Sequence, residues 1–192
     1  SDDNGATWVE KNDFGNSVNS MLVHPFNNNV FVGLVNGDIY RSNDEGDSWT
    51  PLPGFGKSVD AIAGSTNATR VFVGLGGDAS NIRVSVDNGS TWGPAGAADI
   101  DDQYILALGV HPFNNYVFAG TRDQGLFLST NQGSSWISRN NNLIASDVKS
   151  IAVDKNTGYL FAATTNTIYR STNNGGSWQE FAAGLTPANN DM

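Results

Sequence analysis

The chain has 192 residues, a formal net charge of −9 and no cysteine. The negative charge disfavours binding to nucleic acid or to anionic membranes, and the lack of cysteine excludes disulfides, thiolate chemistry and Cys-based zinc sites. No stretch reaches the roughly 18 apolar residues of a membrane span. Abundant glycine (22 residues) and short asparagine clusters are typical of a turn-rich all-β protein.

A motif Ser-x-(Asp/Asn)-x-Gly-x-x-Trp, which we call the box, occurs five times along the chain. Successive box tryptophans are 41, 43, 44 and 42 residues apart, a period typical of one propeller blade. The defining residues are Ser1, Asp3, Gly5 and Trp8; Ser42, Asp44, Gly46 and Trp49; Ser85, Asp87, Gly89 and Trp92; Ser129, Asn131, Gly133 and Trp136; and Ser171, Asn173, Gly175 and Trp178.

Three strand patterns recur in the same order between the boxes. The first is expected at 18–23, 59–64, 105–110 and 148–153, the second at 30–33, 71–74, 117–120 and 160–163, and the third at 38–41, 82–84, 126–128 and 167–170; a fourth strand starts near each box tryptophan. Small residues at one position of the first strand predict that this strand is innermost, at Ser20, Ala61, Ala107 and Ser150.

Such strands predict an all-β fold, a β-propeller of four-stranded antiparallel blades, because one small sheet cannot bury both of its faces alone. The blades are expected at about 17–53, 58–94, 104–138 and 147–182, with residues 1–12 forming the outer strand of an incomplete blade. Four blades and a partial one indicate part of a larger propeller. A small closed ring and closure through oligomerisation are the alternatives.

The box chemistry predicts a rim hairpin. The Asp or Asn should accept hydrogen bonds from backbone N–H groups two residues on, the glycine should supply positive φ, and the serine should tie the loop to itself. The tryptophan should pack between sheets while its indole N–H finds a partner.

The five boxes resemble the BNR or Asp-box repeat of sialidases, sortilin-type receptors, xyloglucan-degrading propellers and a photosystem II assembly propeller. The resemblance covers essentially the whole chain and implies that the boxes lie at the rim, away from the ligand face. It therefore implies the fold and leaves the ligand open. The arginines are dispersed and the Phe/Tyr-Arg-Ile-Pro segment of sialidases is missing, which argues against sialidase activity.

The ligand face should lie where loops enter the first strand and where turns join the second and third. On that face the sequence offers as binding residues Asp60, Asp78, Arg122, Asp123, Asp147 and Lys149. One position just inside the first strand differs chemically in every blade, which indicates a site, although drift at solvent positions gives the same pattern; it reads Asn19, Asp60, Leu106 and Lys149.

The sequence predicts no metal site and no cofactor. His24 and His111 recur in a Val-His-Pro-Phe-Asn-Asn segment, where turn formation is the favoured interpretation. The acidic cluster at 99–102 lacks the alternating ligand spacing of an EF-hand loop.

We therefore expect a non-catalytic, secreted or cell-surface module for protein or glycan recognition or extracellular assembly, with the periplasm as another location. The alternative is a glycoside hydrolase, for which two opposed carboxylates would be needed. The expected partners are a protein or glycan ligand and further blades, and neither nucleic acid nor a membrane span is expected.

Overall fold

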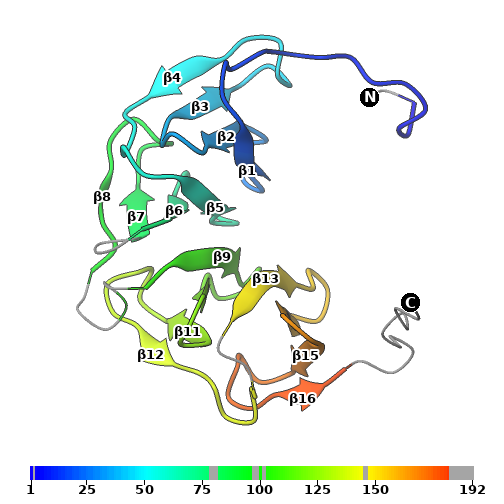
Figure 1. The fold of residues 1–192 in the computed structure, drawn as a ribbon, viewed down its shortest axis with the longest axis vertical. Coiled ribbons are helices and arrows are strands. Elements are labelled where there is room, and N and C mark those ends of the chain that lie inside the picture. The colour runs from blue at the N-terminus through cyan, green and yellow to red at the C-terminus, as the bar shows by residue number, and fades with distance from the viewer. Residues whose placement is uncertain (2, 78–81, 97–99, 101–102, 145–146, 182–192) are drawn as a thin grey trace, which may run out of the picture.

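The computed structural model describes residues 1, 3–77, 82–96, 100, 103–144 and 147–181, and the described part is all-β (Figure 1). It contains four antiparallel four-stranded sheets whose strands are paired in chain order. They are β1 (Val18–Val23), β2 (Val30–Leu34), β3 (Ile39–Ser42) and β4 (Thr50–Leu52); β5 (Val59–Gly64), β6 (Val71–Leu75), β7 (Ile82–Ser85) and β8 (Gly93–Pro94); β9 (Ile105–Val110), β10 (Val117–Thr121), β11 (Leu126–Ser129) and β12 (Ile137–Ser138); and β13 (Val148–Val153), β14 (Leu160–Thr164), β15 (Ile168–Ser171) and β16 (Gln179–Glu180).

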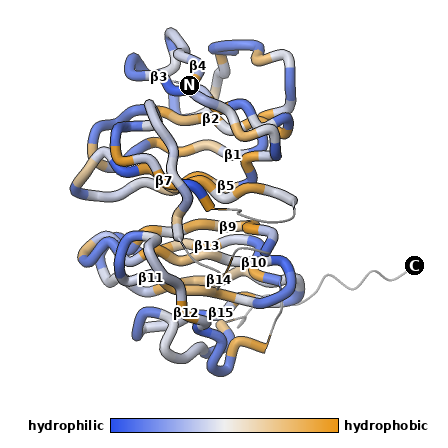
Figure 2. The backbone as a smooth tube through the Cα atoms, turned by 90° about the vertical axis from the view of Figure 1, so that its left-hand side faces the viewer, coloured by the Kyte–Doolittle hydropathy of each residue, from blue (hydrophilic) through white to orange (hydrophobic). Residues whose placement is uncertain are grey.

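The sheets follow one another around an arc that is open between the first and the last (Figure 1). Strands β1, β5, β9 and β13 line the inner side of the arc, which confirms the sequence prediction of blades with an innermost first strand. Viewed from the side, hydrophobic residues concentrate in the stacked strands and hydrophilic residues in the loops (Figure 2). The predicted all-β architecture of consecutive four-stranded antiparallel blades is confirmed.

A separate apolar core lies between each pair of consecutive sheets. The second strand contributes a buried phenylalanine at the same place in three blades: Phe31, Phe72 and Phe118, each at most 1% exposed. Because burial of a large aromatic side chain stabilises strongly, these cores hold neighbouring blades together without a common central core.

A glycine in the second strand lets consecutive sheets approach closely. Gly74 faces Ile105 of the next blade, and a Cβ atom on this glycine would lie within 3.0 Å of the isoleucine side chain. Gly33 faces Val59 and Gly120 faces Val148 in the same way. The sheets are therefore packed so tightly here that even one methyl group has no room.

Each box is tied together by its own side chains, as the second box illustrates. The Gly46 N–H donates to Ser42 Oγ at 2.8 Å, and Ser42 Oγ donates to Asp44 Oδ1 at 2.7 Å. Asp44 also accepts from the Ser48 N–H and hydroxyl. The Asp44 carboxylate thus accepts hydrogen bonds from the residue four positions later, whereas the sequence prediction placed the donor two positions later. The turn is longer than predicted because two consecutive residues, Glu45 and Gly46, have positive φ.

The box tryptophans differ in their surroundings. Trp136 and Trp178 are buried, at 2% and 4% exposure, and the Trp178 indole N–H donates to the Arg139 carbonyl at 2.8 Å. The indole N–H groups of Trp49, Trp92 and Trp136 have no such partner among the described residues, contrary to expectation. Trp8 is 81% exposed, and no strand is found before its box in the described part of the chain.

Residues 3–17 contain turns and bends but no strand, which differs from the outer strand expected at 1–12. A fourth strand needs a third strand to pair with, and the described chain has none before the first box. The segment nevertheless packs on the first blade, since Phe14 contacts the ring of Trp49 at 5.2 Å between centroids.

Replacing Gly74 by alanine should lower the free energy of unfolding by about 1–3 kcal/mol, because the added methyl group overlaps Ile105. Urea denaturation measures the loss. Gly93→Ala is the matched control, since nothing lies within 4 Å of a Cβ atom there, and it should change stability by no more than about 0.5 kcal/mol. Equal effects of the two substitutions would contradict the close-packing argument.

The three box aspartates should make stability sensitive to acid. Hydrogen bonds from the Ser48 hydroxyl, the Ser48 N–H and Ser42 lower the pKa of Asp44 from 3.8 to about 2. A folded-state pKa below the unfolded value adds stability that is complete above pH 3.8 and is lost as the pH falls through about 2.

Asp44→Asn should remove the contribution of Asp44 to this acid sensitivity while preserving the box. In the fourth and fifth boxes Asn131 and Asn173 accept from the backbone N–H four residues on, and their Nδ2 donates to the serine hydroxyl there. Asp44→Ala should lower the urea midpoint at pH 7 further than Asp44→Asn does. Denaturation of the three proteins between pH 2 and pH 7 measures both effects. A parallel pH profile for the wild type and the Asn variant would refute the assignment.

Candidate functional site

A β-bulge in the inner strand of every blade points one side chain out of the ladder. In β1, Val18 pairs with Leu34 and Ser20 pairs with Gly33, so Asn19 is left between them. The same skip occurs in β5, β9 and β13. The four residues left unpaired are Asn19, Asp60, Leu106 and Lys149, the position that differs in every repeat. Bulges of this kind redirect side chains and occur often next to functional sites.

These four side chains together line a cavity of about 320 Å³, which we call the axial cavity. Asp60 is held in place: Asn19 Nδ2 donates to its Oδ1 at 2.6 Å, and the Ser58 hydroxyl donates to the same oxygen at 2.5 Å. The cavity therefore presents an amide, a carboxylate, an aliphatic side chain and an ammonium group from four successive blades.

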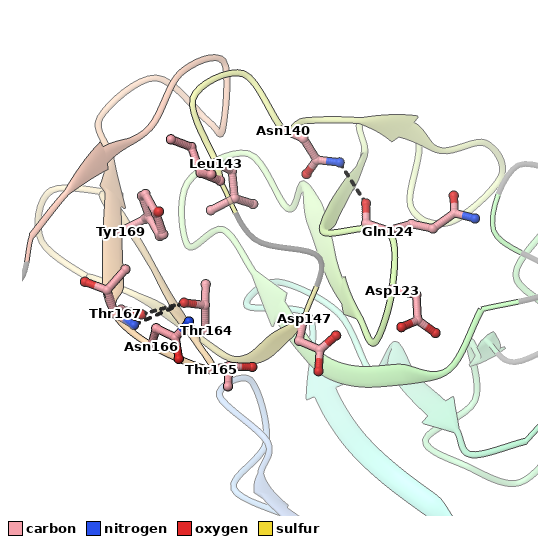
Figure 3. A pocket seen from close by; sticks show the side chains of 11 residues that line it. Asp123, Gln124, Asn140, Leu143, Asp147, Thr164, Thr165, Asn166, Thr167 and Tyr169 are labelled. Carbon is pink, nitrogen blue, oxygen red and sulfur yellow. Dashed lines mark hydrogen bonds between the residues drawn. The ribbon is translucent and has the colours of Figure 1, made fainter.

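A larger cavity of about 880 Å³, the loop cavity, lies between the third and fourth blades (Figure 3). Its lining combines carboxylates, amides and hydroxyls with three apolar or aromatic side chains: Asp123, Gln124, Asn140, Leu143, Ile144, Asp147, Thr164, Thr165, Asn166, Thr167 and Tyr169. Asp123 and Asp147 lie on the same side of this cavity in Figure 3. The structure thus brings together two acids that are 24 residues apart in the chain.

An ion pair connects the two cavities. Lys149 Nζ lies 3.4 Å from Asp147 Oδ2, so one short segment places Asp147 in the loop cavity and Lys149 in the axial cavity. Both side chains are partly exposed, at 52% for Lys149 and 26% for Asp147. The pair therefore positions the side chains more than it stabilises the fold.

The other predicted binding residues lie apart from these cavities or outside the described residues. Arg122 is exposed and stacks on the Tyr104 ring, with its guanidinium carbon 4.2 Å from the centroid. Asp78 lies outside the described residues. Of the six predicted residues, Asp60 and Lys149 share the axial cavity, and Asp123 and Asp147 share the loop cavity.

Sequence reasoning missed the loop following the third blade. Asn140 accepts a hydrogen bond from the Leu126 N–H at 2.8 Å and donates to the Gln124 carbonyl at 2.7 Å, so it fixes one wall of the loop cavity. The opposite wall comes from Thr164 to Thr167, where β14 turns into β15. The run of three asparagines at 140–142 is the sequence feature that could have indicated a functional loop here.

Both histidines close turns and join blades. His24 is buried; its Nδ1 accepts from the Phe26 N–H, so its Nε2 must donate to the Arg70 carbonyl of the next blade, at 3.0 Å. Burial lowers the pKa of His24 and that of His111. Among the described residues, no group of three His, Cys, Asp or Glu side chains could hold a metal ion.

No protein-family model matches the sequence, and no curated protein matches it. In the part of the chain that the structure describes, no helix has the length and apolar character needed to cross a membrane.

Solved structures, in contrast, are similar over most of the chain. A GH74 xyloglucanase from Xanthomonas campestris has 19% sequence identity and a TM-score of 0.70, covering 90% of this chain and 31% of its own. A chain of the nidogen–laminin complex has 11% identity and a TM-score of 0.72, covering 86% and 64%. YCF48 from Cyanidioschyzon merolae has 13% identity and a TM-score of 0.64, covering 86% and 56%.

At these identities the likeness concerns the fold. The chain spans less than a third of the length of the GH74 enzymes it resembles. Together with the four stacked sheets, the comparisons show that this chain has the fold of a β-propeller section.

Proposed function

We propose that this chain is a section of an Asp-box propeller, secreted or displayed at the cell surface, that binds a glycan in the loop cavity without cleaving it. The lining of that cavity carries the proposal. Amide, hydroxyl and carboxylate groups recognise sugar hydroxyls by hydrogen bonding, and Tyr169, Leu143 and Ile144 offer apolar surface for the faces of the sugar rings.

The charges of the loop cavity favour a neutral ligand. Its lining includes two carboxylates and no Lys or Arg among the described residues, so an anionic ligand would be repelled. Lys149 stands at the neighbouring axial cavity and already pairs with Asp147. The GH74 xyloglucanase among the similar structures acts, by its name, on xyloglucan, which makes this polysaccharide the first ligand to test.

A glycoside hydrolase is the second candidate, and one observation favours it: Asp123 and Asp147 line the same cavity. A pair of carboxylates can act as general acid and as base or nucleophile on a glycosidic bond. The recognition function ranks first because amide, hydroxyl, apolar and aromatic side chains make up most of the cavity lining.

Binding should depend on the loop between β14 and β15. The double variant Thr165→Ala, Asn166→Ala removes two polar side chains from the cavity wall and should weaken polysaccharide binding about tenfold, the loss expected for one or two net hydrogen bonds. Affinity electrophoresis against xyloglucan and other neutral polysaccharides measures it. Thr130→Ala, at an exposed box position, should bind as the wild type does.

Turnover separates the two candidate functions. The wild type should release no reducing ends from any polysaccharide that it binds. If it does release them, and Asp123→Asn or Asp147→Asn reduces the rate by about 10²-fold or more, the chain is a hydrolase and the recognition proposal fails. If no neutral polysaccharide binds at all, both glycan functions fail.

A further inference from the structure

The three interfaces between blades use one pair of positions. The first residue of the inner strand is fully buried against the second-strand glycine of the preceding blade, as in the contact of Ile105 with Gly74. Val59 and Val148 occupy the same place against Gly33 and Gly120 and are likewise 0% exposed. The interface thus joins a β-branched knob to a glycine socket.

In the first blade the equivalent residue is Val18, and no described residue of the chain covers the sheet face on which it lies. Val18 is 50% exposed, and its neighbours Met21 and Val23 are 63% and 60% exposed. Ile62 and Leu108, which correspond to Met21, are only 9% exposed. We call the surface formed by Val18, Met21 and Val23 the leading face; it continues the series of interfaces already present in the arc.

The segment before β1 lies where the fourth strand of a blade covering the leading face would lie. Lys11 approaches the position of a Cβ on Gly46 to 3.6 Å, as Leu52 approaches Gly89 from the fourth strand of the preceding blade. Lys11 also pairs with Asp47 at 2.5 Å. A partner at the leading face therefore needs to supply only the three inner strands, because the place of the fourth is taken.

The fourth blade breaks the glycine rule. Ala163 stands where the first three blades have glycine, and it pairs with Ser150 as Gly120 pairs with Ala107. A Cβ atom at the corresponding glycines would lie within 3.0 Å of the β-branched side chain of the next blade. Since β-branched residues are stiff at χ1, seating Val18 of a second copy against Ala163 would carry the same overpacking cost as the substitution Gly74→Ala.

We propose that the leading face binds the three inner strands of a further blade that has glycine opposite Val18, and that a second copy of this chain is disfavoured by Ala163 and obstructed by the segment around Lys11. The partner is thus a blade of the same repeat, selected by a single missing methyl group.

Two fusions test this selection. Residues 104–128, which carry Gly120, or residues 147–170, which carry Ala163, are joined directly to Ser1 of the full chain. Both junctions keep the natural register, because each segment ends just before a box serine. The chain has no cysteine, so Met21→Cys provides a single thiol whose labelling rate reports whether the leading face is covered.

The fusion with residues 104–128 should slow labelling of the thiol at least tenfold relative to the unextended chain. The fusion with residues 147–170 should leave labelling fast, and Ala163→Gly within the added segment should restore protection. A thiol introduced instead by Thr130→Cys, at an exposed box position, should label at the same rate in every fusion.

Equal labelling of the two unmodified fusions, or no protection by either, would overturn the proposal. A second copy as the occupant gives a different result: the unextended chain would form a dimer in sedimentation, and its Met21→Cys thiol would be protected as concentration rises. That outcome would overturn the proposal as well.

Discussion

The contact between a β-branched residue and a glycine is the constraint on which the stacking of the blades depends. Ile105 meets Gly74 without room for a further methyl group, and the same contact recurs at every interface described. Because both strands are held by ladder hydrogen bonds, the contact fixes the distance between sheets at the inner side of the arc. The bulge directly after the first residue of the inner strand then directs the next side chain to the axial cavity, so the packing residue and the cavity residue are adjacent in sequence.

The boxes act at the opposite end of each blade. Their serine and Asp or Asn side chains satisfy the backbone of the hairpin, while the box glycine receives a side chain from the preceding blade, as Gly89 receives Leu52. The box thus serves both its own turn and the rim of an interface. Because of this double role the motif occurs in every blade, while the loops at the axial face differ in sequence. The motif therefore carries no information about the ligand.

Much of the fold could be predicted from the sequence because its determinants are local and repeated. The 41 to 44 residue spacing, the strand patterns and the small residues at Ala61 and Ala107 were sufficient to predict the four described sheets, the order of their strands and which strand is innermost. Comparing the repeats also identified Asn19, Asp60, Leu106 and Lys149, which the bulges bring to one cavity.

The features that could not be predicted depend on contacts between different repeats, and the sequence of one repeat does not determine such contacts. The loop cavity requires that the loop of Asn140 face the turn after β14, which follows only once the third and fourth blades are stacked. The reach of the box carboxylate also escaped prediction, because the positive φ of Glu45, a non-glycine residue, lengthens the turn in a way that the sequence does not announce.

At the axial face, residues that pack the blades together alternate with residues that line the cavities. Asp147 and Lys149 flank Val148, whose side chain is fully buried against the preceding blade, yet their own side chains point into two different cavities. Replacing Asp147 or Lys149 would change the lining of a cavity and leave the buried contact of Val148 in place. In β1, β5 and β9 the bulged residues Asn19, Asp60 and Leu106 likewise line the axial cavity. The chemistry of this cavity therefore differs from blade to blade, while the first residues of β5 and β9 keep the same contact with the preceding blade.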